Sequence, residues 1–284
     1  IRSFGTDTVP TPNVSGQPDW SAVAAAAMRH RYDLGRQDNG QFETDLSLYS
    51  SRQFKVTQAN VSLVEVATGP RMSPFEGWGS GITMKPFAMG RYVAVNDYTT
   101  YWAWGTGIET TAPVGPGTTV AFTLLGRRRE FVNNFDAPTN NNSSGNEFAP
   151  SLEFRADITP ALSLSFSSNV TRYVAQTPSE SYTEFAASTT LAYRFTDPFG
   201  INGRTWLTSL SAAIGRASYD QPDPTVDPNV SRQQNDMTFS FVLGVPLDET
   251  LTLVSQTTYT RRDANISNYT YQAFTTLAGV SWRF

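Results

Sequence analysis

Residues 277–284 read LAGVSWRF, and this last stretch of the chain decides the fold. Apolar or aromatic side chains recur at every second position back from Phe284, at Trp282, at Val280 and again at Phe274. Polar residues such as Ser281 fall between them. A period of two is that of a β-strand with one apolar and one polar face. The stretch therefore predicts a strand that runs to the last residue.

A C-terminal strand of this kind resembles the signal that the outer-membrane assembly machinery of bacteria recognises. The residues that carry the resemblance are Phe274, Val280, Trp282 and Phe284. The alternative is an edge strand of some other sheet that happens to end in Phe. The rest of the chain has to decide between them.

The same alternation recurs along the chain in segments separated by Gly, Pro, Asn and Asp clusters. In 181–195, for example, Phe185, Leu191 and Tyr193 share one row, and Glu184 and Arg194 share the other. We expect strands near 1–8, 20–33, 41–52, 56–67, 80–94, 98–111, 117–132, 147–158, 162–174, 181–195, 205–219, 234–246, 250–262 and 269–284.

These predicted strands are about twice the usual mean of 5 to 6 residues, as a tilted strand that crosses a membrane requires. They indicate one all-β domain over 1–284, a transmembrane antiparallel up-and-down β-barrel of about 14 strands. Thirteen strands can be read from Trp20 onward, and bacterial single-chain barrels have even numbers. We therefore assign 1–8 to a further strand, with 1–19 as first strand and loop or as an N-terminal extension. Residues 22–28 are rich in Ala and could instead begin a helix.

The connections alternate between long polar loops, such as 133–146 and 220–235, and tighter turns, such as 159–161 and 246–249. Outer-membrane barrels have short periplasmic turns and longer external loops. The asymmetry predicts a bacterial outer-membrane location, with the C-terminus at the periplasmic face.

Composition argues against several other classes of function. The chain has no Cys, a single His and a net charge of -4. We expect no metal, no cofactor, no catalytic residues and no nucleic-acid partner. His30 shares a row with Met28 and Tyr32 and should face lipid, away from any interior site.

The polar rows carry charges of both signs, which would line the lumen of a barrel. Both a wetted pore and a lumen plugged by paired charges are compatible with them. Arg91, Arg127 and Arg129 lie near the predicted outer mouth and favour a weak preference for anions. The charged residues assigned to the lumen are Lys85, Arg91, Arg127, Arg129, Glu153, Arg155, Asp157, Glu184, Arg194 and Asp236.

Four arginines fall instead on the lipid-facing rows, near the outer ends of outward-running strands: Arg128, Arg172, Arg216 and Arg261. The guanidinium group stays charged and matches the geometry of phosphate. We predict contact with lipopolysaccharide phosphates, and the alternative is unspecific snorkelling of long side chains.

The loop after the strand 205–219 contains Asp220, Asp223 and Asp227, with Asp236 at its end. These carboxylates could collect a calcium ion, but the Gly-hinged spacing of a calcium loop is missing. A solvated loop is the interpretation we favour.

Three stretches resemble the C-terminal outer-membrane barrel of a proteobacterial group that includes the surface-lipoprotein assembly modulators. They are TGPRMSPF at 68–75, SYDQPDPTVDPNVSRQQND at 218–236 and RRDANISNYTYQAFTTLAGVSWRF at 261–284. The resemblance concerns turn and strand patterns and implies fourteen strands. The helical repeats that often precede such barrels are absent from this sequence, and the resemblance speaks to architecture.

Taken together, these patterns predict a diffusion or export channel with a polar, mixed-charge lumen. The alternative is a non-conducting anchor or scaffold for a partner protein or surface lipoprotein. The partners expected are outer-membrane lipid and lipopolysaccharide, the assembly machinery, and a protein partner or a missing N-terminal domain. A soluble secreted β-protein is disfavoured, because the outward rows would expose a large apolar belt.

Overall fold

A computed structural model describes residues 19–35, 40–74, 81–134, 137–200 and 203–283, and this part of the chain forms one antiparallel sheet. Fourteen strands follow one another in up-and-down order, which confirms the all-β, antiparallel prediction. They are β1 (Ser21–Asp33), β2 (Gln41–Gln53), β3 (Val61–Arg71), β4 (Thr83–Val95), β5 (Tyr98–Gly115), β6 (Thr118–Phe131), β7 (Gly145–Phe148), β8 (Ser151–Asp157), β9 (Leu162–Ala175), β10 (Tyr182–Thr196), β11 (Thr205–Tyr219), β12 (Gln233–Pro246), β13 (Leu251–Ala264) and β14 (Tyr271–Trp282).

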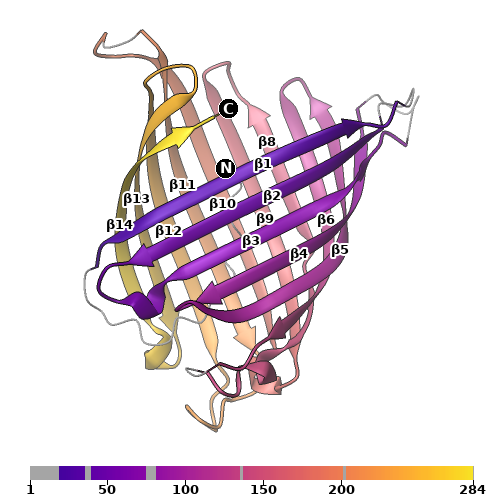
Figure 1. The fold of residues 1–284 in the computed structure, drawn as a ribbon, viewed down its shortest axis with the longest axis vertical. Helices are drawn as coiled ribbons and strands as arrows, with labels where there is room; N and C mark the ends of the chain where they lie inside the picture. The colour runs from indigo at the N-terminus through magenta and orange to yellow at the C-terminus, as the bar shows by residue number, and fades with distance from the viewer. Residues whose placement is uncertain (1–18, 36–39, 75–80, 135–136, 201–202, 284) are drawn as a thin grey trace.

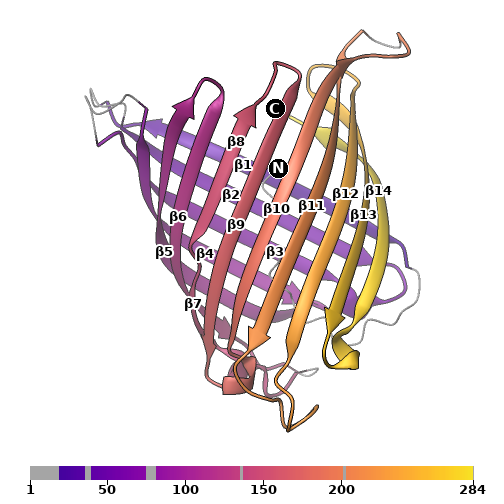
Figure 2. The same cartoon turned by 180° about the vertical axis from the view of Figure 1, so that it is seen from behind.

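The sheet curls round on itself, so that it has an inner and an outward face (Figures 1 and 2). Its hydrogen-bonded order begins at β1 and ends at β14. At one end, which we call the short-turn end, lie the connections β1–β2, β3–β4, β5–β6, β8–β9, β10–β11 and β12–β13. At the other, the long-loop end, lie the 3₁₀ turns η1 (Thr57–Ala59), η2 (Asn140–Ser143), η3 (Pro178–Glu180) and η4 (Ser267–Tyr269).

The strand count agrees with the prediction, but for a different reason. The predicted strand 1–8 lies outside the described residues. The predicted strand 147–158 is instead two strands, β7 and β8, which both pair with β6 and with β9. The break falls at Ala149–Pro150, where proline has no N–H to donate to a neighbouring strand.

Two further expectations concern the first strands. Residues 22–28 form part of β1, so the helical alternative for this Ala-rich stretch is wrong. The prediction 56–67 for the third strand was also wrong at both ends, because β3 runs from Val61 to Arg71. Residues before it form η1, and the Asn60 side chain accepts a hydrogen bond from the backbone N–H of Gln53 at 2.7 Å. That side chain fixes the turn which delays the strand.

The connection between β4 and β5 is a two-residue hairpin turn. Asn96 and Asp97 both have positive φ, 51° and 63°. Two positive values are the requirement of a type I′ turn, whose twist matches that of the flanking strands. Asn and Asp tolerate this conformation better than other residues with a Cβ.

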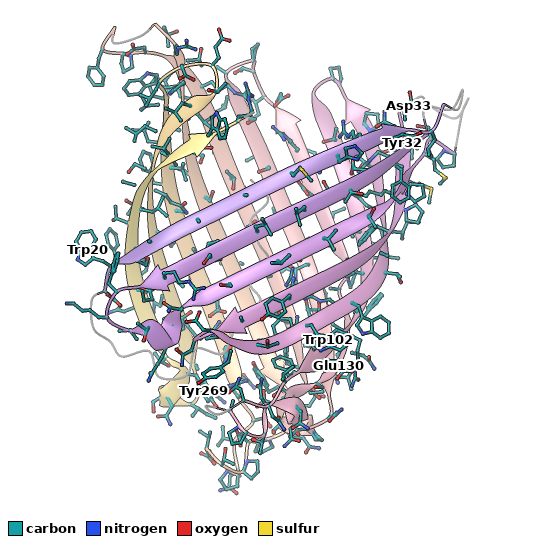
Figure 3. The ribbon with its side chains drawn as sticks, in the orientation of Figure 1. Trp20, Tyr32, Asp33, Trp102, Glu130 and Tyr269 are labelled. Carbon is teal, nitrogen blue, oxygen red and sulfur yellow. The ribbon has the colours of Figure 1, made fainter. Side chains whose placement is uncertain are left out.

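The outward face is apolar and carries aromatic residues toward both ends. Trp20 and Tyr32 lie at opposite ends of β1, and Trp102 lies on the outward face of β5 (Figure 3). Trp104 is 56% exposed on the same row, and Trp282 is 66% exposed at the short-turn end. Among the described residues, no helix is long and apolar enough to span a membrane.

Candidate functional site

The register of the sheet places all ten predicted lumen-lining residues on the inner face. Pairing fixes this, because Lys85 lies opposite Glu109, Arg91 opposite Glu65 and Asp236 opposite Arg262. Glu184 lies opposite Thr171, and Glu153 and Arg155 lie opposite Ser167 and Ser165. The remaining members of the set, on the same rows by the alternation of strand side chains, are Arg127, Arg129, Asp157 and Arg194.

At the short-turn end of β1 to β5, seven inner-face charges form a cluster that we call the basal network. Its centre is Glu43, whose side chain is fully buried. Lys85 donates to Glu43 at 2.7 Å and to Asp45 at 2.6 Å. The other members are Arg29, Arg31, Arg71 and Glu109.

The basal network has more positive than negative groups. Arg31 reaches Glu43 at 3.0 Å, and Arg71 bridges Glu43 at 3.3 Å and Glu109 at 2.7 Å. Four cations against three carboxylates leave a formal charge of +1. A buried carboxylate is tolerated only with such partners.

Near the long-loop end, Glu147 of β7 pairs with two arginines of β6. It lies 2.8 Å from Arg127 and also contacts Arg129. All three side chains are almost fully buried. Gly105 on β5 makes room for Arg127, because a Cβ there would lie 2.5 Å from the Arg127 Cβ.

Tyrosine rings and guanidinium groups line this same end of the inner face, and we call them the mouth collar. Arg129 lies over Tyr173, with 5.0 Å from its Cζ to the ring centroid. Tyr173, Tyr182 and Tyr219 are directly cross-strand neighbours, with centroids 5.4 and 5.3 Å apart. Arg262 lies over Tyr271 at 5.3 Å and pairs with Asp236 at 2.6 Å. The collar joins β6 to β14 along the wall.

Arg232 ties the loops above the collar together. Its guanidinium carbon lies 3.6 Å from the centroid of Tyr219 and 4.3 Å from that of Tyr269 in η4. Burial raises the pKa of Glu180 in η3, and the positive charge of Arg232 opposes that rise. Arg232 therefore packs on β11 and on η4, and its charge also acts on Glu180 in η3.

The middle of the wall from β9 to β13 carries hydroxyl groups instead of charges. Ser167 and Ser188 are hydrogen-bonded at 2.8 Å, as are Thr190 and Ser211. Ser240 and Thr258 continue the row at 3.3 Å. These hydroxyl groups bond along the wall and give one side of the interior a neutral polar surface.

The four outward arginines all lie toward the long-loop end, away from Trp282, but they are not alike. Arg172 forms two hydrogen bonds to Asp220, at 2.8 and 2.6 Å. Arg128 donates to Glu130 at 2.7 Å, and Arg261 to Asp263 at 3.0 Å. Within the described part of the chain, the Arg216 side chain has no ion-pair or hydrogen-bond partner. Only one of the four is thus left without a carboxylate.

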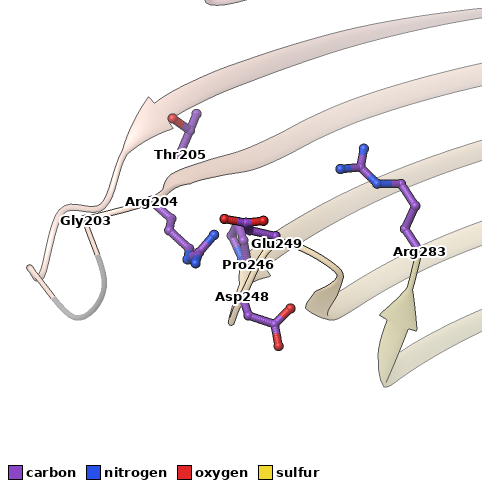
Figure 4. A pocket seen from close by; sticks show the side chains of 7 residues that line it. All are labelled: Gly203, Arg204, Thr205, Pro246, Asp248, Glu249 and Arg283. Atoms are coloured by element: carbon purple, nitrogen blue, oxygen red, sulfur yellow. The ribbon is translucent and has the colours of Figure 1, made fainter.

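A pocket of about 530 Å³ lies among the turns of the short-turn end (Figure 4). Arg204 and Arg283 line it together with Asp248 and Glu249. Asp248 is already engaged, because its carboxylate accepts from the backbone N–H of Thr250 at 2.7 Å and of Leu251 at 2.8 Å. These backbone hydrogen bonds lower the pKa of Asp248. The pocket is a consequence of turn geometry.

The aspartates of the loop 220–232 do not converge. Asp220 pairs with Arg172, and Asp236 pairs with Arg262. Asp223 accepts hydrogen bonds from Thr225, at 2.8 Å from its backbone N–H and 2.7 Å from its hydroxyl group. No group of three or more potential metal ligands occurs among the residues described by the structure.

Several inner-face residues escaped prediction from sequence. Arg71 was missed because the third strand was expected to end too early, although it continues the row of Glu65. Glu147 and Arg262 could have been found from the rows of Arg127 and Asp236. Arg232 lies outside the strands, and alternation carries no information there.

Neither a scan against protein-family models nor a search of curated proteins found a match to this chain.

Proposed function

We propose that this chain is an outer-membrane β-barrel that works as a diffusion or export channel. The observation that carries the proposal is the direction of the inner-face ion pairs. Lys85–Glu43 and Arg71–Glu109 join strands two apart, and Arg127–Glu147 joins neighbours. Each of these pairs therefore runs along the wall of the sheet, between strands that are neighbours or two apart. Charges paired along a wall leave the space between walls open.

Membrane insertion is part of the same proposal and has its own support. The outward rows expose large apolar side chains, such as Leu210 at 60% and Phe274 at 71%, which would be costly in water. Strands of up to 18 residues suffice to cross a bilayer at a tilt. The long-loop end then faces the exterior, and Trp282 lies at the periplasmic face.

The test is conductance across a planar bilayer after reconstitution of the purified chain. We expect discrete conductance steps with a weak preference for anions. Arg155→Glu with Arg194→Glu should shift the reversal potential toward cations, because both inner-face charges are reversed. Lys55→Glu, in the loop between β2 and β3, is the matched control. Absence of conductance from folded protein would contradict the channel.

A non-conducting anchor or scaffold for a protein or surface-lipoprotein partner is the second candidate. The basal network favours it, because Glu43 and Lys85 crowd the inner face of β1 to β5 with buried side chains. If this cluster closes the interior, Arg71→Ala should create conductance in a barrel that otherwise has none. If the barrel already conducts, the same change should raise its conductance only slightly.

A further inference from the structure

We propose that the outward face of β9 to β14 holds a specific site for a phosphorylated glycolipid of the outer leaflet, of the lipid A type. The phosphate would bind Arg216 and an acyl chain would occupy an apolar groove in the same face. The inference rests on the proposed membrane location and orientation, and it narrows four candidate arginines to one.

The groove has a volume of about 550 Å³ and lies at mid-height of the wall. Two transverse rows form it. Leu191, Leu210 and Phe241 are cross-strand neighbours in one row, and Thr189, Ala212 and Phe239 are neighbours in the next. The small side chains of Thr189 and Ala212 leave a hollow beside the larger ones, and Tyr259 and Phe274 extend the second row. A hollow lined by aliphatic and aromatic groups fits a hydrocarbon chain.

Arg216 stands directly above this hollow along β11. Ala212, Ile214 and Arg216 share the outward row, and Ile214 is 59% exposed between the other two. Four residues of strand place Arg216 about 13 Å from Ala212. A guanidinium at the headgroup level and an apolar hollow below it match an amphiphile with an anionic head and an acyl tail.

Charge selects Arg216 over its neighbours. Arg172 and Arg261 each hold a carboxylate, and a phosphate would have to displace it. Among the described residues Arg216 has no such competitor, and its cross-strand neighbours on the outward face are Phe185 and Asn235. The long-loop end, where Arg216 lies, faces the exterior in the proposed orientation, and this selects an outer-leaflet lipid.

The experiment is native mass spectrometry of the folded barrel in detergent, titrated with diphosphoryl lipid A or with phosphatidylglycerol. We expect retention of lipid A over phosphatidylglycerol. Arg216→Gln should reduce retention at least tenfold, whereas Arg261→Gln, the matched control, should change it less than twofold. Ala212→Phe fills the hollow and should weaken lipid A binding while Arg216 remains.

A specific site at Arg216 and unspecific binding of anionic lipid to the barrel predict different results in this titration. Equal retention of both lipids, or equal loss in Arg216→Gln and Arg261→Gln, would overturn the proposal. If Ala212→Phe bound lipid A as tightly as the unchanged barrel, the groove would not be the binding place of the acyl chain, and the proposed site would be wrong in that part. Heat-modifiable migration on gels shows that each variant is folded. Conductance is measured separately, so failure of the lipid site and failure of the channel can be distinguished.

Discussion

Arg172 on the outward face of β9 holds both carboxylate oxygens of Asp220, at 2.8 and 2.6 Å. The pair joins β9 to the loop that follows β11, across the whole width of β10. The backbone N–H of Asp220 also donates to the carbonyl of Ser181 at 2.9 Å. One aspartate thus fastens the root of the longest described loop to two other elements.

The first prediction concerns the titration of Asp220. The hydrogen bonds from Arg172 hold the pKa of this carboxyl below its ordinary value. Stability from the pair is therefore present above the unfolded pKa of about 3.9 and is lost as the pH falls through the folded value. Carboxyl-carbon NMR should show Asp220 titrating below the ordinary value of an aspartate. Arg172→Ala should raise the pKa of Asp220 toward that value, and an unchanged pKa of Asp220 would contradict the pairing.

The second prediction concerns the centre of the basal network. Lys85→Met removes two charged hydrogen bonds, one to the fully buried Glu43 and one to Asp45. The free energy of unfolding should fall by about 1.5 to 3 kcal/mol for each bond, the range for hydrogen bonds to charged groups. Urea unfolding in lipid vesicles measures the change. Lys55→Met, at the only other lysine, should have almost no effect.

The third prediction concerns the turn between β4 and β5. Asn96 has a φ of 51°, a conformation that costs a residue with a Cβ about 1 to 2 kcal/mol unless its side chain can bond locally. Asn96→Ala should therefore lower the free energy of unfolding by about 1 kcal/mol. Asn96→Gly should leave it nearly unchanged. Equal losses in urea unfolding would show that the side chain matters for another reason.

The fourth prediction concerns Arg232. Arg232→Met removes stacking on Tyr219 and Tyr269, each such contact contributing about 0.5 to 2 kcal/mol. Backbone amides in 220–232 and 265–270 should exchange hydrogen faster, while those of β1 to β4 should not change. The pKa of Glu180, already raised by burial, should rise further without the opposing charge. Arg204→Met, at the short-turn end, should leave both loops protected.

Alternation alone predicts most of this fold. In 181–195 it assigns Phe185, Leu191 and Tyr193 to the outward face and Glu184 and Arg194 to the inner face, as the register shows. It fails where a side chain or a proline interrupts the ladder. Asn60 delays the start of β3, and Pro150 divides β7 from β8. Neither effect changes the alternation of polar and apolar residues, so the alternation does not predict them.

The candidate site is less accessible from sequence than the fold. The alternation along each strand identifies Arg127 and Lys85 as inner-face residues. Which charged residue each of them pairs with depends on how neighbouring strands are staggered relative to one another. Lys85 lies directly opposite Glu109 yet bonds Glu43, two strands away. The groove below Arg216 depends on small and large side chains that meet across the six strands β9 to β14, so the sequence of a single strand does not show it.

β7 and β8 run in the same direction, and this bears on the directions of the two edge strands of the sheet. With that pair counted as one traverse, the described strands make thirteen antiparallel traverses, so β1 and β14 run the same way. All of β1 is exposed on both faces. A strand placed between β1 and β14, with antiparallel bonding to both, would have to run from the short-turn end to the long-loop end. The two edge strands therefore accept an added peptide strand in one direction and not in the other.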